Sequence, residues 1–393
     1  MRKRVLAVAS LIASITLSMT GCADVRAQSD DAVMPLGQKS FEQYASETYE
    51  WMAAHRHFVS NNHKQELALH APFEIKPEKP NGKGVLLIHG FTDSPFNFRD
   101  TAKELAEAGF LVRAIVLPGH GTKPADMLAI DYDNWTQVVH EQTELLAKET
   151  ENTYLAGFST GGNLAVTEAY RNTEVDGLIL FSPALAIRTK LVNLVPLANL
   201  FIDWLKEPDE KTADVTLLRY RNAPLPALKA FSDSMNESFE LLKNKPYDKP
   251  VLVFMTEHDS IVDTQKLLPI FQKQFRSRDT RLIWYGDKLP EDVQPIDARL
   301  TTRSDYLPEQ HIRSFSHLGI VFSPQNPWYG PNGKIKYCLR SQSEALRLQC
   351  ENNEEVWYGS WYENRDGHPY ARLSFNPYFQ WQTQLIINVL DRL

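Results

Sequence analysis

A serine flanked by two glycines, in the segment G-F-S-T-G at residues 157–161, is the strongest chemical signal in the sequence. The pattern G-x-S-x-G is short and common by chance, so its context decides its meaning. An apolar run, 154–158, leads into the serine, and a small-residue segment with helical spacing, 162–170, follows it. A strand that turns this sharply into a helix strains the serine backbone, and glycines on both sides relieve the crowding. We therefore predict that Ser159 is a nucleophile exposed at a helix N-terminus, whose dipole favours negative charge.

A second motif, H-G-F-T at residues 89–92, directly follows the apolar run 85–88. The loop after this strand lies beside a serine held on such a turn, and its backbone N–H groups can face a developing oxyanion. We expect the amides of Phe91 and Thr160 to form a two-donor oxyanion hole. His89 itself is interpreted as a structural residue.

A serine nucleophile needs a base, and the base needs a carboxylate that orients it. With this kind of turn, the chain order is nucleophile, acid, histidine. Asp259 follows the apolar run 251–255, where a loop at the carboxyl edge of a parallel sheet presents an acid. Asp259 is therefore the predicted acid, with Asp263 as its competitor and Glu257 as a poorer third candidate.

The predicted base is His317, which follows all the core strands and precedes the last helix. His311, in a nearby loop, is its main rival. His368 lies in a later segment that contains two cysteines and fits worse. His258 is next to the predicted acid and is interpreted as a residue at the rim of the site.

The sequence shows no pattern for metal or nucleotide chemistry. It contains no H-E-x-x-H and no paired C-x-x-C, the spacings typical of zinc sites. It also lacks a Walker loop and a G-x-G-x-x-G fingerprint. We therefore expect a reaction that needs no metal and no organic cofactor.

Short apolar runs alternate with helical segments, which predicts an α/β fold with a mostly parallel central sheet covered on both faces. Near the N-terminus, residues 38–60 resemble a helix, whereas 67–69 and 73–75 look extended. The expected core strands are 85–88, 111–117, 154–158, 178–181, 251–255 and 281–285, and the expected helices are 100–108, 135–148, 162–170 and 379–393.

Two insertions interrupt this alternation, at residues 186–249 and 323–373. The first contains an apolar stripe at helical spacing that either lines an acyl pocket or packs on the core. The second is rich in aromatic residues, and we interpret it as a small subdomain around its own disulfide, with substrate or membrane binding as the alternative. The stripe consists of Leu191, Leu194, Ala198, Phe201 and Leu205.

The N-terminus carries a targeting signal. Basic residues at positions 2–4 precede an apolar stretch, 5–17, and small residues then lead to Cys22. This pattern resembles a bacterial lipoprotein signal, although Met19 is less usual at its position than Leu or Val. The apolar stretch is shorter than the roughly 20 residues of a spanning helix. An ordinary signal peptide with an incidental cysteine is the alternative.

We accordingly predict a signal peptide over 1–21, lipidation of Cys22, a tether over 22–37, and a place in the bacterial cell envelope, facing the periplasm or the exterior. Two cysteines then remain, Cys338 and Cys350. A lone pair this close in an exported chain predicts one local disulfide, with two buried thiols as the alternative.

Charge narrows the choice of partners. The 393 residues carry a net charge of −7, with 43% hydrophobic and 23% charged residues, as in an ordinary globular protein. Binding to a phosphate backbone needs a concentrated basic face, and no such face is readable in the sequence. We therefore expect no nucleic-acid partner.

Together, these motifs resemble the bacterial carboxylesterase and monoacylglycerol lipase branch of the α/β-hydrolase superfamily. The resemblance implies Ser159, Asp259 and His317 as a catalytic triad, Phe91 and Thr160 as oxyanion donors, and a cap between the strands at 178 and 250. The stretch between the acid and the base is longer than the family usually needs, and 323–373 has no recognised counterpart. The matching pieces are H-G-F-T-D-S-P at 89–95, L-P-G-H-G at 117–121, D-N-W at 133–135, the serine motif, Asp259 and Ser316-His317.

The expected activity is that of a serine hydrolase that cleaves carboxylic esters through an acyl-enzyme. Ser159 attacks the carbonyl with His317 as base, and water then attacks the acyl-enzyme. Short-chain or medium-chain acyl esters or monoacylglycerol-like lipids are the expected substrates, and the lipid anchor provides contact with a membrane. Alternatives are a thioesterase, a peptidase or a C–C hydrolase with the same residues, or a non-catalytic surface lipoprotein that retains the fold for binding.

Overall fold

The structure is a computed structural model that describes residues 33–189, 192, 194–209, 211–290, 293, 297–361 and 367–393. The predicted signal peptide, Cys22 and most of the tether lie outside the described residues, as does Leu191 of the apolar stripe. Among the described helices, none is long and apolar enough to cross a membrane.

An eight-stranded sheet forms the centre of the molecule, in the order β1-β3-β2-β4-β5-β6-β7-β8. Strand β1 pairs antiparallel with β3, and the other neighbours pair in parallel. The predicted α/β fold with a mostly parallel sheet is therefore confirmed. The strands are β1 (Phe73–Ile75), β2 (Lys83–Ile88), β3 (Leu111–Ile115), β4 (Asn152–Phe158), β5 (Val175–Phe181), β6 (Val251–Thr256), β7 (Arg281–Tyr285) and β8 (Leu300–Arg303).

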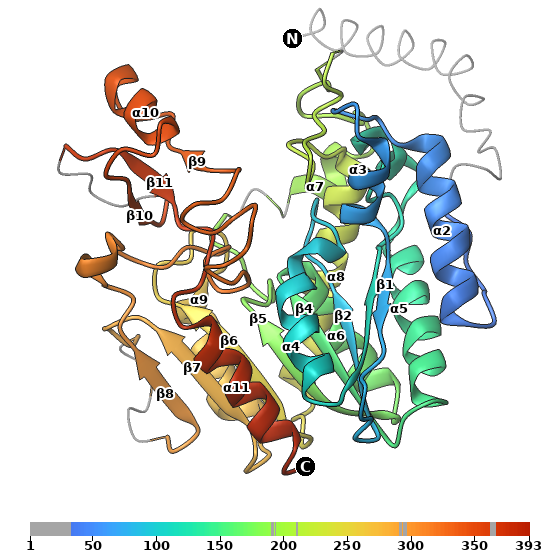
Figure 1. Ribbon diagram of the computed structural model, residues 1–393. Coiled ribbons are helices and arrows are strands. Elements are labelled where there is room, and N and C mark those ends of the chain that lie inside the picture. Colours follow the sequence, from blue (N-terminus) through green and yellow to red (C-terminus); the bar gives the residue numbers. More distant parts are fainter. Residues whose placement is uncertain are drawn as a thin grey trace, which may run out of the picture.

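Helices cover both faces of this sheet (Figure 1). Side chains alternate along β2, so that Leu86 and Ile88 belong to the core that includes residues of α5, α6 and α8, while Val85 and Leu87 belong to the core that includes residues of α4 and α11. All four are fully buried, which explains the continuous apolar run. The helices are α2 (Phe41–His55), α3 (His63–His70), α4 (Arg99–Glu107), α5 (Tyr132–Ala147), α6 (Thr160–Arg171), α7 (Val195–Ala198), α8 (Leu225–Asn244), α9 (Thr264–Gln274), α10 (Glu344–Glu351) and α11 (Phe379–Leu390).

One N-terminal element differs from the prediction. Residues 67–69, predicted as extended, belong to helix α3. The side chain of Asn62 caps this helix by accepting a hydrogen bond from the backbone N–H of Gln65 at 3.1 Å. Three apolar residues in a row also fit one turn of helix, and the cap upstream decides between strand and helix. The prediction for 67–69 was therefore wrong because it ignored the cap.

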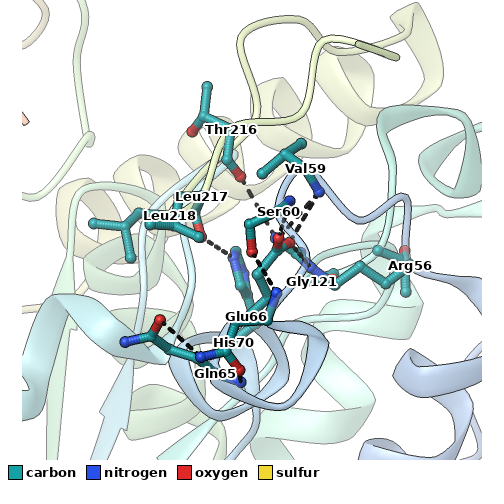
Figure 2. Close-up of polar contacts among 12 residues, drawn as sticks. Arg56, Val59, Ser60, Gln65, Glu66, His70, Gly121, Thr216, Leu217 and Leu218 are labelled. Carbon is teal, nitrogen blue, oxygen red and sulfur yellow. Dashed lines mark hydrogen bonds and ion pairs between the residues drawn. The ribbon is translucent and has the colours of Figure 1, made fainter. Parts of the chain in front are cut away.

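A buried ion pair lies between α2 and α3 (Figure 2). Arg56 Nε donates to Glu66 Oε2 at 3.1 Å, and both side chains are fully buried. Arg56 Nη1 also donates to the carbonyl oxygen of Gly121 at 2.7 Å. Glu66 Oε1 accepts the backbone N–H groups of Val59 and Ser60 at 3.1 and 2.5 Å. These partners satisfy both buried charged groups, and the contacts hold the turn between the end of α2 at His55 and the start of α3.

The same cluster reaches the first insertion. Arg56 Nη2 donates to the carbonyl oxygen of Thr216 at 3.5 Å, and His70 Nε2 bonds the carbonyl oxygen of Leu217 at 2.8 Å (Figure 2). Burial, with the Arg56 charge as the next cause, holds the pKa of His70 well below its usual value. The neutral imidazole therefore donates from Nε2, and the N-terminal helices fasten the insertion to the body of the molecule.

In the first insertion, called here the cap insertion (186–249), the apolar stripe differs from both alternatives that its spacing suggested, an acyl pocket and packing on the core. Helix α7 has only four residues, and Leu194, Phe201 and Leu205 are 59%, 78% and 70% exposed. A helix of one turn is too short to have an apolar face and a polar face. The helical spacing of the stripe therefore does not lead to its burial. The longer helix α8 packs against α6 instead and buries Phe231 and Met235.

The second insertion, called here the disulfide lobe (323–373), lies at one end of the molecule, around the label α10 in Figure 1. Its three strands, β9 (Tyr337–Cys338), β10 (Trp357–Gly359) and β11 (Tyr370–Arg372), form a sheet in the order β10-β11-β9. The expected disulfide between Cys338 and Cys350 is present and joins β9 to α10. Cys350 and Tyr358 belong to the same hydrophobic core as Val85 of β2, so the lobe packs on the main sheet and not only around its disulfide.

Replacing Arg56 with methionine should lower the free energy of unfolding by about 3–5 kcal/mol, because Glu66 is left buried without its counter-charge. Urea titration followed by tryptophan fluorescence measures this loss. The matched control is Lys103→Met, whose ion pair with Glu107 is exposed and should change stability by less than about 1 kcal/mol. Equal losses in the two variants would contradict a stabilising role of the buried pair.

Candidate active site

Ser159 lies between β4 and α6 in a strained backbone conformation. Its φ of 54° and ψ of −115° are rare for a residue with a side chain. A Cβ atom on Gly157 would lie 2.2 Å from the carbonyl oxygen of Gly161. One on Gly161 would lie 2.0 Å from the carbonyl oxygen of Ile88. Both glycines of the motif are therefore required by backbone contacts that cannot move apart without displacing α6.

Neighbouring backbone holds the serine in this conformation. The Ser159 N–H donates to the carbonyl oxygen of Phe181 at 3.0 Å, and its own carbonyl oxygen accepts the N–H of Ala184 at 3.1 Å. Asn163 Nδ2 donates to the carbonyl oxygen of Ala184 at 3.1 Å, which ties α6 to the same loop. The serine hydroxyl makes no hydrogen bond to a described residue and faces a cavity that His317 also lines.

Asp259 and His317 come together although 58 residues separate them. His317 Nδ1 and Asp259 Oδ2 are 2.7 Å apart, while Asp259 Oδ1 accepts the backbone N–H groups of Ile261 and Val262, each at 2.8 Å. Burial alone would raise the pKa of Asp259, but the facing imidazole and these hydrogen bonds outweigh it and hold the pKa below its usual value. The pair thus presents an ionised acid behind a histidine whose Nε2 is left for the cavity.

The competing candidates lie elsewhere in the structure. Asp263 pairs with Lys266 at the start of α9, at 2.8 Å. Glu257 accepts a backbone N–H from beyond β7. His311 and His368 lie against the ring of Trp357, with ring centroids 5.1 and 5.5 Å from it. None of these four lines the cavity that contains Ser159.

Asp305 is a site-supporting residue that the sequence analysis missed. Its Oδ2 atom accepts the backbone N–H of Phe315 at 3.0 Å and lies 2.7 Å from His258 Nδ1. It therefore joins the residue next to Asp259 to the segment just before His317. No local pattern announces this role, because Asp305 lies beyond β8, in the long stretch between acid and base.

Glu257, His258 and Asp305 also place one potential ligand atom each within 4.8 Å of one another. Asp305 is buried, and Glu257 and His258 are half-buried. The hydrogen bonds that the cluster makes to surrounding backbone account for its arrangement, so we assign it a structural role.

Two buried histidines shape the loop at residues 89–92. His89 Nε2 accepts the backbone N–H of Leu117 at 3.1 Å, and its Nδ1 bonds the carbonyl oxygen of Gly90 at 2.8 Å. His120 Nε2 accepts the N–H of Thr92 at 3.1 Å. Burial lowers the pKa of His89 to about 4 and that of His120 well below its usual value. Both rings are therefore neutral near pH 7, as their acceptor roles require.

This bonding leaves the expected oxyanion donors available. The backbone N–H groups of Phe91 and Thr160 have no acceptor among the described loops and turns, whereas the next amide in the loop, that of Thr92, is held by His120. Thr160 is the first residue of α6, where backbone N–H groups lack intrahelical partners. The loop after β2 and the N-terminus of α6 are thus the segments that carry the two free amides.

The cavity has a volume of about 210 Å³. No described residue of the 194–205 stripe lines it, so the first of the two alternatives for this stripe, an acyl pocket, is wrong for the described residues. Two arginines that the sequence analysis did not single out, Arg219 and Arg372, do line it. The apolar wall consists of Phe91, Phe158, Ile187, Leu228, Phe231, Ile261 and Leu318, and Thr92 and Asp93 complete the lining beside Ser159 and His317. Two other surface hollows, beside α5 and α8, contain none of the predicted site residues.

Comparisons with known proteins find several chains that are similar to this one. The chain is similar to a thermostable monoacylglycerol lipase of Bacillus sp. (strain H-257), with 29% identity over 191 residues that cover 48% of this chain and 75% of the relative. It is also similar to a carboxylesterase of Bacillus subtilis (strain 168), with 22% identity over 215 residues that cover 53% of this chain and 85% of the relative. A solved structure from the metagenome-derived lipolytic enzymes LipS and LipT shares 25% identity, covers 56% of this chain and 88% of its own, and gives a TM-score of 0.47.

A family model described as "Serine aminopeptidase, S33" (Hydrolase_4) matches residues 79–288, about half of the chain. The match includes the loop at 89–92, Ser159 and Asp259, whereas His317 and the disulfide lobe lie beyond it. The chain therefore belongs to this Hydrolase_4 family and has the α/β-hydrolase fold.

Proposed function

We propose that the chain is a serine hydrolase that cleaves carboxylic esters through an acyl-enzyme. The observation that carries the proposal is the meeting of Ser159, on its strained turn, with the Asp259–His317 pair at one cavity. His317 Nε2 takes the proton from Ser159 Oγ as the oxygen attacks the ester carbonyl. The same imidazole then gives this proton to the departing alcohol.

The second half of the reaction uses the same groups. Water attacks the acyl-enzyme, gives its proton to His317, and releases the carboxylic acid while Ser159 regains its proton. The amides of Phe91 and Thr160 stabilise the negative oxygen in both steps, where loss of one donor typically costs on the order of 100-fold or more in rate. Asp259 holds the imidazole orientation and stabilises the imidazolium.

The apolar wall and the relatives' activities indicate the substrate class. Leu228 and Phe231 of α8, with Ile187, suit an acyl chain, and the cavity volume favours a short or medium one. The similar proteins are named as a monoacylglycerol lipase and a carboxylesterase. The family description names a peptidase, which uses the same groups, so amide substrates belong in any test of specificity.

We further propose that the chain is an exported lipoprotein attached through Cys22. Support comes from the basic start, the short apolar stretch and the small residues before this cysteine. The disulfide of the lobe fits an oxidising compartment outside the cytoplasm. The envelope location and the membrane contact rest on this anchor.

Ser159→Ala should abolish hydrolysis of 4-nitrophenyl esters with acyl chains of increasing length, with a loss in kcat of at least about 1,000-fold. The acyl-chain length that the wild type hydrolyses fastest indicates the size of the pocket. A fluorophosphonate probe should label the wild type and Ser277→Ala, a serine outside the cavity, but not Ser159→Ala. Turnover that survives in Ser159→Ala, or a folded wild type that the probe fails to label, would refute the proposed mechanism and favour a non-catalytic binding protein.

Asp305→Ala should lower kcat by roughly 10-fold to 100-fold with little change in KM, because the loop that carries His317 loses its tie to the acid loop. Asp305→Asn keeps an oxygen acceptor for the Phe315 N–H and should restore most of the rate. Steady-state kinetics measure the effect on the rate, and thermal unfolding measures the effect on stability. An Asp305→Ala protein that is less stable but has an unchanged kcat would show that Asp305 only stabilises the fold.

Cys22→Ser should move the protein from the detergent phase to the aqueous phase in a detergent partition of cell extracts, because the lipid anchor is lost. Ser29→Ala, within the predicted tether, is the control and should leave the partition unchanged. Retention of Cys22→Ser in the detergent phase would argue against a lipid on this cysteine.

A further inference from the structure

Arg372 is a buried cation in the wall of the proposed active site. Its side chain comes from β11 of the disulfide lobe, is 8% exposed, and lines the same cavity as Ser159 and His317. Its Nε atom donates to Ser316 Oγ at 3.3 Å, and its guanidinium carbon lies 5.2 Å from the ring centre of Trp361. The lobe therefore delivers a positive charge beside the nucleophile.

Within the part of the chain that the structure describes, the guanidinium has no direct counter-charge. Among the described residues, no carboxylate oxygen lies within 4.0 Å of it, and its two Nη atoms donate no hydrogen bond. Both carboxylate oxygens of Asp259 are already occupied, one by His317 and the other by two backbone amides. Burial, followed by the charge of Arg219, lowers the pKa of Arg372 to about 10, which still leaves the group protonated at neutral pH.

The second arginine of the cavity differs in this respect. Arg219, from the cap insertion, lies 3.4 Å from Asp93 Oδ1 and donates to Thr92 Oγ1 at 3.0 Å. Asp93 in turn accepts from Asn97 Nδ2 at 3.2 Å. The charge of Arg219 is thus balanced within the protein, whereas that of Arg372 is left to face the cavity.

A buried charge without a partner is costly, and proteins usually pair it. The planar fork of a guanidinium matches carboxylate and phosphate groups with two parallel hydrogen bonds. The Trp361 ring and the Ser316 hydroxyl hold this fork in place while leaving its outer nitrogens available. These features together are those of an anion-binding subsite beside a reacting serine.

We propose that Arg372 is a specificity-determining residue, and that the preferred ester substrates carry an acidic group, a carboxylate or a phosphate, that binds its guanidinium. This inference rests on the proposed ester hydrolysis. The predicted preference for acidic substrates differs from that of an enzyme for uncharged esters, because a neutral substrate would leave the Arg372 guanidinium buried and unpaired. The competing explanation is that Arg372 only balances the charges of Asp93 and Asp259 at a distance.

Matched pairs of esters test the proposal. One pair places a carboxylate on the acyl arm, namely 4-nitrophenyl hydrogen adipate against 4-nitrophenyl methyl adipate. The other places a phosphate on the alcohol arm, namely 1-butyrylglycerol 3-phosphate against 1-butyrylglycerol. We expect the wild type to prefer the charged member of at least one pair by about 10-fold or more in kcat/KM, and that pair identifies the arm and the acid.

Variants connect the preference to the residue. Arg372→Met should reduce the charged-to-neutral ratio of kcat/KM by about 10-fold or more, and Arg372→Lys should restore part of it. Arg347→Met, in the same lobe but on an exposed ion pair, should leave the ratio unchanged. Labelling of Ser159 by the fluorophosphonate probe shows that each variant retains a folded site.

Three results would overturn the inference. A wild-type ratio near or below one in both pairs would show no anion preference. If Arg372→Met lowered kcat/KM equally for the charged and the neutral ester of a pair, the result would favour the charge-balancing role. Absence of all ester turnover, with no probe labelling of the wild type, would overturn the proposed hydrolysis itself and this inference with it.

Discussion

Close contact between three backbone segments at Ser159 is the constraint on which the rest of the site depends. Gly161 lies against the end of β2, and Gly157 lies against the first turn of α6, at distances that exclude any side chain. This contact fixes the positive φ of the serine and brings the loop after β2 close to the N-terminus of α6. Ser159, the proposed nucleophile, and both expected oxyanion donors are thus positioned by one packing requirement.

The proposed acid and base, Asp259 and His317, depend on a different kind of constraint, which is long-range. The stretch between Asp263 and His317 contributes α9, β7 and β8, and so widens the sheet without separating Asp259 from His317. Asp305 then returns the chain to the acid loop through His258 and Phe315. An insertion that looked unfavourable for the pairing is accommodated because it forms regular structure of its own and is anchored at its end.

The parts of the fold and site that could be predicted are those that short sequence patterns encode. The core strands, the strand–turn–helix around Ser159, the loop at 89–92 and the candidates Asp259 and His317 all follow from local spacing and chain order. The roles of Asp305, Arg219 and Arg372 could not be predicted, because each acts on residues far away in sequence. The stripe at 194–205 misled because helical spacing gives no information on whether a helix continues long enough to pack.

The disulfide lobe forms one wall of the cavity, and this wall is held in place differently from the part that the main sheet forms. Strand β11, which carries Arg372, pairs with β9, and β9 is tied to α10 by the Cys338–Cys350 bond. The main sheet carries Ser159, Asp259 and the loop at 89–92. Neither cysteine of the disulfide belongs to these segments. The Cys338–Cys350 bond therefore constrains the wall of the cavity that carries Arg372, whereas Ser159 is held by close backbone packing between β2, β4 and α6, so a change that loosens this bond acts first on the charged wall.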